Sequence, residues 1–312
     1  MQRYDFAFPS ADGMTRIHAV EWVPEGAPQA VLVVSHGVSE YILRYEGLAR
    51  FLTERGFVVA GHDHLGHGTS VAEGHPRLYF GKKGSWDWVV ADLYQRRQLA
   101  GQRFPGVPVF LMGHSMGSFL ARTYLIRYPG TVQGAILMGT GQMSPALVAA
   151  GRTIAAREIR KVGEDHSSPV VMKLAFGAYN KRFAPNRTAF DWLSLDTGNV
   201  DRYLKDPLCG ENPTVGLFRE MLSGIAFITK GANLKKMNMN TPILFISGAQ
   251  DPVGDCGKGV ERAAAAFQRA GMRDVTVKLY PELRHEVLKE DCREQVYDDI
   301  DRWLEGKLAG VR

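Results

Sequence analysis

The stretch VFLMGHSMGSFLARTYL, residues 109–125, decides the fold of this chain. Its apolar start, residues 109–112, shows no alternation, which is typical of a strand buried on both faces. Gly113 to Gly117 then match G-x-S-x-G, and a helical pattern covers 116–128. A strand, this motif and a helix together predict a strained turn that lifts the Ser115 hydroxyl above a sheet, where it can act as a nucleophile. The alternative is a glycine-flanked serine at an ordinary strand–helix turn.

Working outward from this stretch, buried strands alternate with helical segments. Further apolar runs without alternation occur at 30–34, 57–60, 135–138, 243–246 and 275–280. Apolar side chains fall at helical spacing within 85–104 and 296–308. This alternation predicts an α/β fold with a doubly wound parallel sheet. Residues 16–22 alternate between apolar and polar, which favours an antiparallel hairpin at one sheet edge.

The alternation fails over residues 141–231, where proline, arginine, asparagine and aromatic residues mix and the helical patterns are short. We therefore expect an α/β core formed by residues 1–140 and 232–312, with residues 141–231 inserted as a helical cap over one end of the sheet.

The composition is that of a folded, globular protein. Of 312 residues, 45% are hydrophobic and 23% charged, which excludes a disordered or fibrous chain. The net charge of +5 is spread along the sequence and is poor evidence for nucleic-acid binding. No apolar run approaches the roughly 18 residues of a membrane span, and residues 1–8 lack the apolar core of a signal peptide. The three well-separated cysteines form no CxxC pair, so we expect a reducing, cytoplasmic location.

A serine nucleophile needs a histidine base and a carboxylate that orients it. In this fold the partners follow the serine in the order acid, then histidine. Asp251 follows the strand at 243–246, and His285 follows the last strand. Asp255 is a rival acid farther from its strand, and Glu286, beside the histidine, is expected to be solvated.

The negative oxygen that forms during acyl transfer needs two backbone donors. One is expected to be the amide of Met116, directly after the serine. The other is expected from the loop after the strand at 30–34, at Val38, with Gly37 allowing close approach of the substrate. His36 is expected to bond loop backbone and not to act as a second base.

A possible metal site lies at residues 61–68, where His62, Asp63, His64 and His67 are potential ligands. The spacing does not give the H-x-H-x-D-H pattern of metallohydrolases, and a further acidic ligand is missing. The alternative is a glycine-rich turn in which these side chains bond the backbone. We therefore predict no metal and no organic cofactor.

Four stretches together resemble the monoacylglycerol lipase and lysophospholipase group of α/β-hydrolases, within the serine aminopeptidase S33-like assemblage. These are Ser35-His36-Gly37, Arg44-Tyr45, the segment DHLGHGTS at 63–70, and GHSMG at 113–117. The resemblance covers almost the whole chain and is weakest in the cap. One departure is Tyr41, which stands where family members often carry histidine.

This resemblance implies a mostly parallel eight-stranded sheet with a helical cap. It also implies Ser115 as nucleophile, His285 as base, Asp251 as orienting acid, and Val38 and Met116 as oxyanion donors.

The activity expected from the resemblance is serine carboxylester hydrolysis of monoacylglycerol or lysophospholipid-like esters through an acyl-enzyme. An aminopeptidase of the same fold, similar to proline iminopeptidases, would need acidic cap groups for the substrate ammonium, and Glu158, Glu164 and Asp165 are candidates. A non-catalytic ligand receptor on the same scaffold is a third reading. The basic side of the helix near 145–161 is a candidate for contact with a lipid surface. We favour the alternative that this helix packs on the core. The sequence does not define the oligomeric state.

Overall fold

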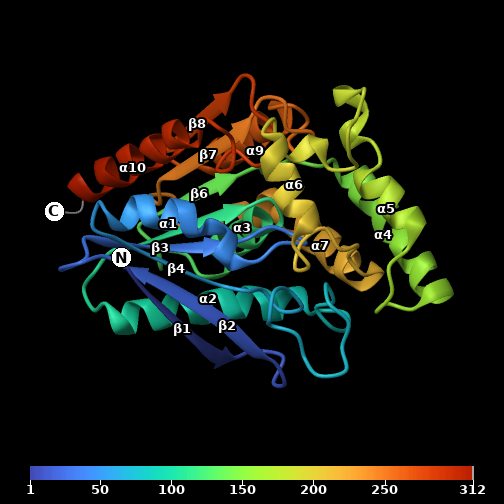
Figure 1. The fold of residues 1–312 in the computed structure, drawn as a ribbon, viewed down its shortest axis with the longest axis horizontal. Helices are drawn as coiled ribbons and strands as arrows, with labels where there is room; N and C mark the ends of the chain where they lie inside the picture. Colours follow the sequence, from blue (N-terminus) through green and yellow to red (C-terminus); the bar gives the residue numbers. More distant parts are fainter. Residues whose placement is uncertain (311–312) are drawn as a thin grey trace.

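The structure, a computed structural model, describes residues 1–310. The strands of this part form one sheet of eight in the order β1-β2-β4-β3-β5-β6-β7-β8 (Figure 1). They are β1 (Gln2–Pro9), β2 (Arg16–Val23), β3 (Ala30–Ser35), β4 (Phe57–His62), β5 (Val109–His114), β6 (Gly134–Met138), β7 (Ile243–Gly248) and β8 (Val275–Tyr280). The predicted eight-stranded α/β-hydrolase sheet is thereby confirmed.

Strands that are buried on both faces pair in parallel with one another, whereas the more exposed first strand pairs antiparallel. From β4 to β8 all neighbours are parallel, and every residue of β3, β4, β5, β6 and β7 is buried. The first two strands form an antiparallel hairpin at the edge, as the alternation of residues 16–22 predicts. Parallel pairing brings the carboxyl ends of the central strands to one edge, where β3 ends at Ser35 and β5 at His114.

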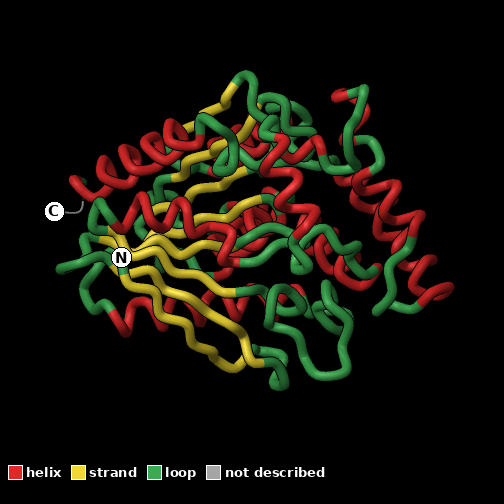
Figure 2. Tube along the Cα trace, in the orientation of Figure 1, coloured by secondary structure: helices red, strands yellow, loops and turns green. Residues whose placement is uncertain are grey.

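Helices cover both faces of the sheet (Figures 1 and 2). On one face lie α1 (Glu46–Thr53) and α10 (Arg293–Ala309), and on the other α2 (Trp86–Arg103), α3 (Met116–Arg127) and α9 (Lys258–Ala270). Each face has its own core of buried apolar side chains, so the central strands β3 to β7 are shielded from water on both sides, as a parallel sheet requires. The expectation of burial on both faces is wrong for β8, because this strand lies at the sheet edge and most of its residues are exposed or half-buried.

Between β6 and β7 the described chain forms helices and no strand. The α-helices are α4 (Pro145–Val162), α5 (Pro169–Phe176), α6 (Thr197–Lys205), α7 (Val215–Ile228) and α8 (Gly231–Leu234). Two short 3₁₀ helices, η2 (Tyr179–Phe183) and η3 (Asp191–Leu193), lie between α5 and α6. In Figure 1, α4 to α7 lie beyond the carboxyl ends of the central strands. No helix within residues 1–310 is long and apolar enough to cross a membrane.

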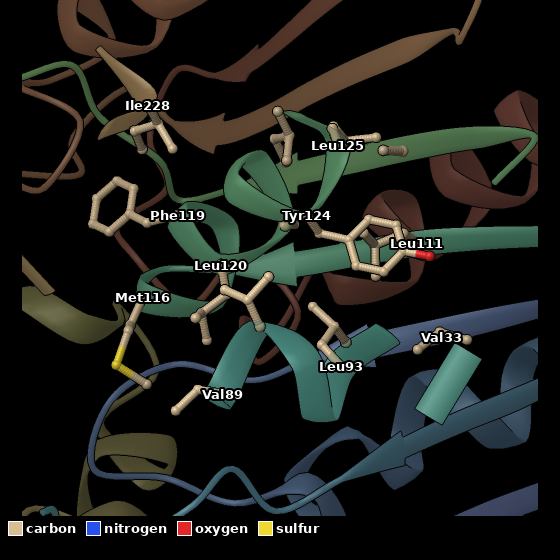
Figure 3. Close-up of a cluster of buried hydrophobic side chains, with 14 of the residues drawn as sticks. Val33, Val89, Leu93, Leu111, Met116, Phe119, Leu120, Tyr124, Leu125 and Ile228 are labelled. Atoms are coloured by element: carbon tan, nitrogen blue, oxygen red, sulfur yellow. The ribbon is translucent and has the colours of Figure 1, made fainter. Parts of the chain in front are cut away.

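The last long helix of this insertion shares the main core. Figure 3 shows Ile228 of α7 in the same apolar cluster as Phe119, Leu120 and Tyr124 of α3. Ile228 and Leu120 are fully buried. The helix that leads the chain back to the sheet is therefore held by hydrophobic packing against the helix that starts at Ser115.

We predict that Leu120→Ala lowers the free energy of unfolding by about 2–5 kcal/mol, because it removes buried methyl groups and leaves a cavity. Leu174→Ala on α5 is the matched control, since this side chain is 62% exposed, and it should change stability by no more than about 0.5 kcal/mol. Urea unfolding followed by circular dichroism measures both. Equal losses would contradict this account of the core.

Candidate active site

Ser115 lies on a strained turn between β5 and α3. Its backbone has φ 53° and ψ −121°, a conformation that costs free energy for any residue with a Cβ. A side chain at Gly117 would collide with the backbone oxygens of Ser35 and His36, and one at Gly113 would collide with the carbonyl of Gly117. The two motif glycines are therefore required by packing, as the sequence pattern predicts.

His285 and Asp251 meet at the same edge of the sheet. The Nδ1 of His285 lies 2.9 Å from Oδ2 of Asp251 and donates to it, and both side chains are buried. Asp251 also accepts hydrogen bonds from the amide of Val253 at 2.9 Å and from the hydroxyl of Ser247 at 3.2 Å. Burial opposes the charged imidazole, but the Asp251 carboxylate outweighs it, so the pKa of His285 is raised. This arrangement fixes the ring with its Nε2 available to another group.

The rival acid, Asp255, does not take part in this arrangement. Its side chain is exposed and pairs with Arg262 at 3.0 Å. Ser115 and His285 line one cavity. Among residues 1–310, no hydrogen bond joins the Ser115 hydroxyl to the His285 ring. Such catalytic contacts are often long before substrate binds and tighten afterwards.

The loop after β3, residues 36–41, which we call the oxyanion loop, passes directly over Ser115. A Cβ at Gly37 would lie 3.2 Å from Cβ of Ser115. Val38 and Met116 both line the cavity. Met116 opens α3, so its amide has no acceptor inside the helix, and neither amide donates to another described residue. Two backbone donors are therefore available beside the serine.

The cavity has a volume of about 280 Å³ and is lined by both apolar and polar side chains. Its apolar wall includes Phe119, Met172, Phe176, Trp192, Leu193 and Met221. Its polar wall includes Ser39, Glu40, Arg44, Tyr203, Glu211 and Glu286. A ligand with an apolar tail and a polar head matches this lining.

Each carboxylate of the polar wall is paired with an arginine. Arg44 donates to Glu40 at 2.8 Å and to both oxygens of Glu286, at 2.6 and 3.0 Å. Glu211 pairs with Arg77 at 3.1 Å. The expectation that Glu286 is solvated is wrong: its side chain is 4% exposed. The four-residue spacing of Glu40 and Arg44 predicts that they pair. No local pattern links them to Glu286, which is 242 positions beyond Arg44 in the sequence.

The histidines of the 61–68 segment pack together below the oxyanion loop. The rings of His36 and His64 lie 4.2 Å apart, and those of His62 and His64 4.8 Å apart. Asp63 accepts from the amides of Ile42 and Thr69, and His36 bonds Gly37 and the amide of His64, so Asp63 and His36 bond loop backbone as expected. His64 differs, because its Nε2 lies 3.0 Å from the hydroxyl of Ser35. Within residues 1–310, no group of three or more histidine, cysteine or acidic side chains is arranged to hold a metal ion.

Burial keeps these imidazoles neutral. Loss of hydration on burial lowers the pKa of His62 and of His67 to about 3. Both ring nitrogens of His62 are buried without a hydrogen-bond partner.

The sheet, the strained serine turn and the buried Asp–His pair at its carboxyl edge define an α/β-hydrolase. Residues 26–292 match the model of the family described as serine aminopeptidase, S33, and the chain belongs to this family. The family resemblance seen in the sequence is confirmed.

Named relatives and solved structures agree with this membership. The chain is 30% identical over 291 residues to the monoglyceride lipase of Homo sapiens, covering 92% of this chain and 86% of that protein. It is 28% identical to the monoacylglycerol lipase of Mycolicibacterium smegmatis, covering 98% of each. A thermostable carboxyl esterase from Bacillus coagulans, solved in complex with glycerol, superposes with a TM-score of 0.91 at 28% identity and 99% coverage of each chain.

We predict that acid destabilises the fold partly through His62. The unfolded chain binds a proton at His62 below its ordinary pKa of 6.5, whereas the folded chain does so only near 3. Stability is therefore lost as pH falls from 6.5 toward 3, by at most about 1.4 kcal/mol per pH unit for one histidine.

Urea midpoints at pH 6.5 and 5.0 test this prediction for the wild type and His62→Leu. The variant should lose less stability than the wild type over this interval. Other groups titrate equally in both proteins, so identical losses would show that His62 does not carry the effect.

Proposed function

We propose that this protein hydrolyses monoacylglycerols as a serine esterase, with Ser115 as nucleophile, His285 as general base and Asp251 as the acid that orients His285. The observation that carries the proposal is the buried Asp251–His285 hydrogen bond at a cavity that also holds the strained Ser115. Lipase and esterase relatives that align over almost the whole chain support it.

The proposed reaction proceeds in two halves. The Ser115 Oγ attacks the ester carbonyl carbon while His285 Nε2 takes the hydroxyl proton, and the amides of Val38 and Met116 hold the negative oxygen. The tetrahedral intermediate collapses, and His285 returns the proton to the departing glycerol oxygen. Water, deprotonated by His285, then attacks the acyl-enzyme, and the fatty acid leaves as Ser115 regains its proton. Asp251 keeps Nδ1 protonated throughout.

We predict that Ser115→Ala abolishes ester turnover and labelling by a fluorophosphonate probe. Asp251→Asn should lower kcat by about 10³–10⁴-fold, because an amide can favour the wrong tautomer of His285. Asp255→Asn is the matched control, since Asp255 pairs on the surface with Arg262, and it should retain wild-type turnover. These rates are measured with a p-nitrophenyl ester and with 1-monooleoylglycerol.

Turnover by Ser115→Ala at the wild-type rate would overturn the nucleophile assignment. A wild type that binds acyl esters without turning them over would favour the non-catalytic receptor.

The charges of the cavity favour an uncharged head group. Each carboxylate of the described cavity lining, on Glu40, Glu211 and Glu286, is paired with Arg44 or Arg77. Arg44 is held by two carboxylates, so it is not available to bind a phosphate. Glycerol, which has hydroxyls and no charge, suits this wall better than a phosphoglycerol.

The same pairing argues against an aminopeptidase. The acidic cap residues suggested by the sequence do not line the cavity: Glu158 pairs with Lys161 and Glu164 with Arg219. Asp165 is exposed and contacts His166. An α-ammonium would therefore find no free carboxylate among the described residues of the cavity wall.

We predict that kcat/KM for 1-monooleoylglycerol exceeds that for oleoyl lysophosphatidate by at least about tenfold, since like charges placed close together cost several kcal/mol. Equal acyl chains make the head group the only difference, and both are compared below their critical micelle concentrations. An aminoacyl p-nitroanilide should not be turned over. A preference for the phosphate ester, or rapid anilide cleavage, would contradict the head-group assignment.

We also propose that the outer face of α4 and α5 approaches a lipid surface. Leu147, Val170 and Leu174 are exposed there, and Arg152, Arg157, Arg160 and Lys161 lie on α4. Exposed apolar side chains beside basic ones suit an anionic lipid interface. The cytoplasmic location expected from the cysteines stays a prediction.

A further inference from the structure

The loop that carries His285, residues 281–290, is hydrogen-bonded to residues 191–199 of the cap, the helical insertion between β6 and β7. The amide of Glu286 donates to the carbonyl of Leu193 at 2.7 Å. Glu290, which is 1% exposed, accepts from the Ser194 hydroxyl at 2.8 Å and from the Leu195 amide at 3.0 Å. We call residues 281–290 the histidine loop. Arg284 donates to the carbonyls of Asp191 and Ser194, so hydrogen bonds on both sides of His285 hold this loop to the cap.

Residues 203–210 of the cap are hydrogen-bonded to the oxyanion loop. The Tyr203 hydroxyl donates to the carbonyl of Ser39 at 3.1 Å, and the amide of Gly210 donates to the same oxygen at 3.2 Å. The Tyr41 hydroxyl donates to Asp206 at 2.8 Å. Segment 191–211, which contains α6, therefore bridges the two loops that carry the base and an oxyanion donor.

One buried charge network lies at the centre of this bridge. Glu286 accepts from both terminal nitrogens of Arg44 and, at 2.7 Å, from the side-chain amide of Asn199 on α6. Arg44 reaches Glu40, and Glu40 accepts from the amide of Gly37 at 2.6 Å. Asn199 is 3% exposed. The chain from α6 through Glu286, Arg44 and Glu40 ends at the backbone next to Val38.

We propose that Glu286 is a positioning residue for ester hydrolysis: through Arg44 and Asn199 it fixes the histidine loop against the oxyanion loop and α6. This inference rests on the proposed function of Ser115 and His285. Its physical basis is that a displacement of about 1 Å between reacting groups can lower a rate by roughly 10²-fold. Segment 191–211 then belongs to the scaffold of the reaction centre, in contrast to a cover that moves freely.

Two other roles for Glu286 would give different experimental results when the residue is substituted. A head-group contact would affect only substrates that carry a glycerol moiety. A purely structural ion pair would change stability without changing the pH dependence of turnover. The charged and titratable groups that face His285 from the surrounding elements are Asp251, Glu40, Arg44, His114, Tyr179 and Glu286.

The first test is Glu286→Gln, which keeps the shape of the side chain and removes its charge. We expect kcat to fall about tenfold with KM within twofold, equally for 1-monobutyrylglycerol and p-nitrophenyl butyrate. The acid limb of the kcat profile should move to lower pH, because a negative charge beside His285 is lost and Arg44 is left less neutralised. Glu282→Gln is the matched control: this glutamate lies in the same loop but is exposed, and the variant should behave as wild type.

The second test is Asn199→Ala, which leaves the Arg44–Glu286 pair intact and removes only the link to α6. We expect a severalfold loss of kcat with KM unchanged for both substrates. This variant keeps the test valid if Glu286→Gln does not fold.

Three outcomes overturn the proposal: wild-type kcat in both variants, a loss confined to the glycerol ester, or an unmoved acid limb in Glu286→Gln. If instead the wild type fails to hydrolyse either ester, or Ser115→Ala remains active, the proposed function itself has failed.

Discussion

Close packing between the first turn of α3 and the end of β3 is the constraint on which the site depends. Gly117 lies so near the carbonyls of Ser35 and His36 that no side chain fits between them. This contact forces Ser115 into its strained backbone conformation and brings the oxyanion loop over it. Ser115 and the backbone at Gly37 and Val38 are thus placed by the same steric requirement, and parallel strand order brings Asp251 and His285 to that edge.

Charge pairing inside the cavity gives the site its expected chemistry. Arg44 would be a phosphate-binding group if it stood alone, but two buried carboxylates hold it. Removing one member of such a pair would leave an uncompensated buried charge, which is why the pairs persist despite their desolvation cost. The apolar and polar side chains that line the cavity support the proposal of an acyl ester with a neutral head group as substrate.

The helical insertion has parts that differ in their attachments. Helix α7 shares the apolar core with α3, and segment 191–211 is hydrogen-bonded to both catalytic loops. Helices α4 and α5 expose Leu147, Val162, Val170 and Leu174. The insertion therefore combines elements that are anchored beside Ser115 and His285 with outer helices that expose apolar side chains to solvent.

The sequence by itself determined what depends on local pattern. Uninterrupted apolar runs specify the central strands, which are buried on both faces, and the glycines around Ser115 specify the tight turn, because these requirements act over a few residues. The choice of Asp251 over Asp255 could be made from the distance to the strand end.

Only the tertiary structure decided which charges neutralise one another. Glu286 looked like a solvated neighbour of His285, and nothing near it in the chain signals Arg44 or Asn199. Its burial arises because the histidine loop, the oxyanion loop and α6 converge, and electrostatic partners follow distance in space and not distance along the chain.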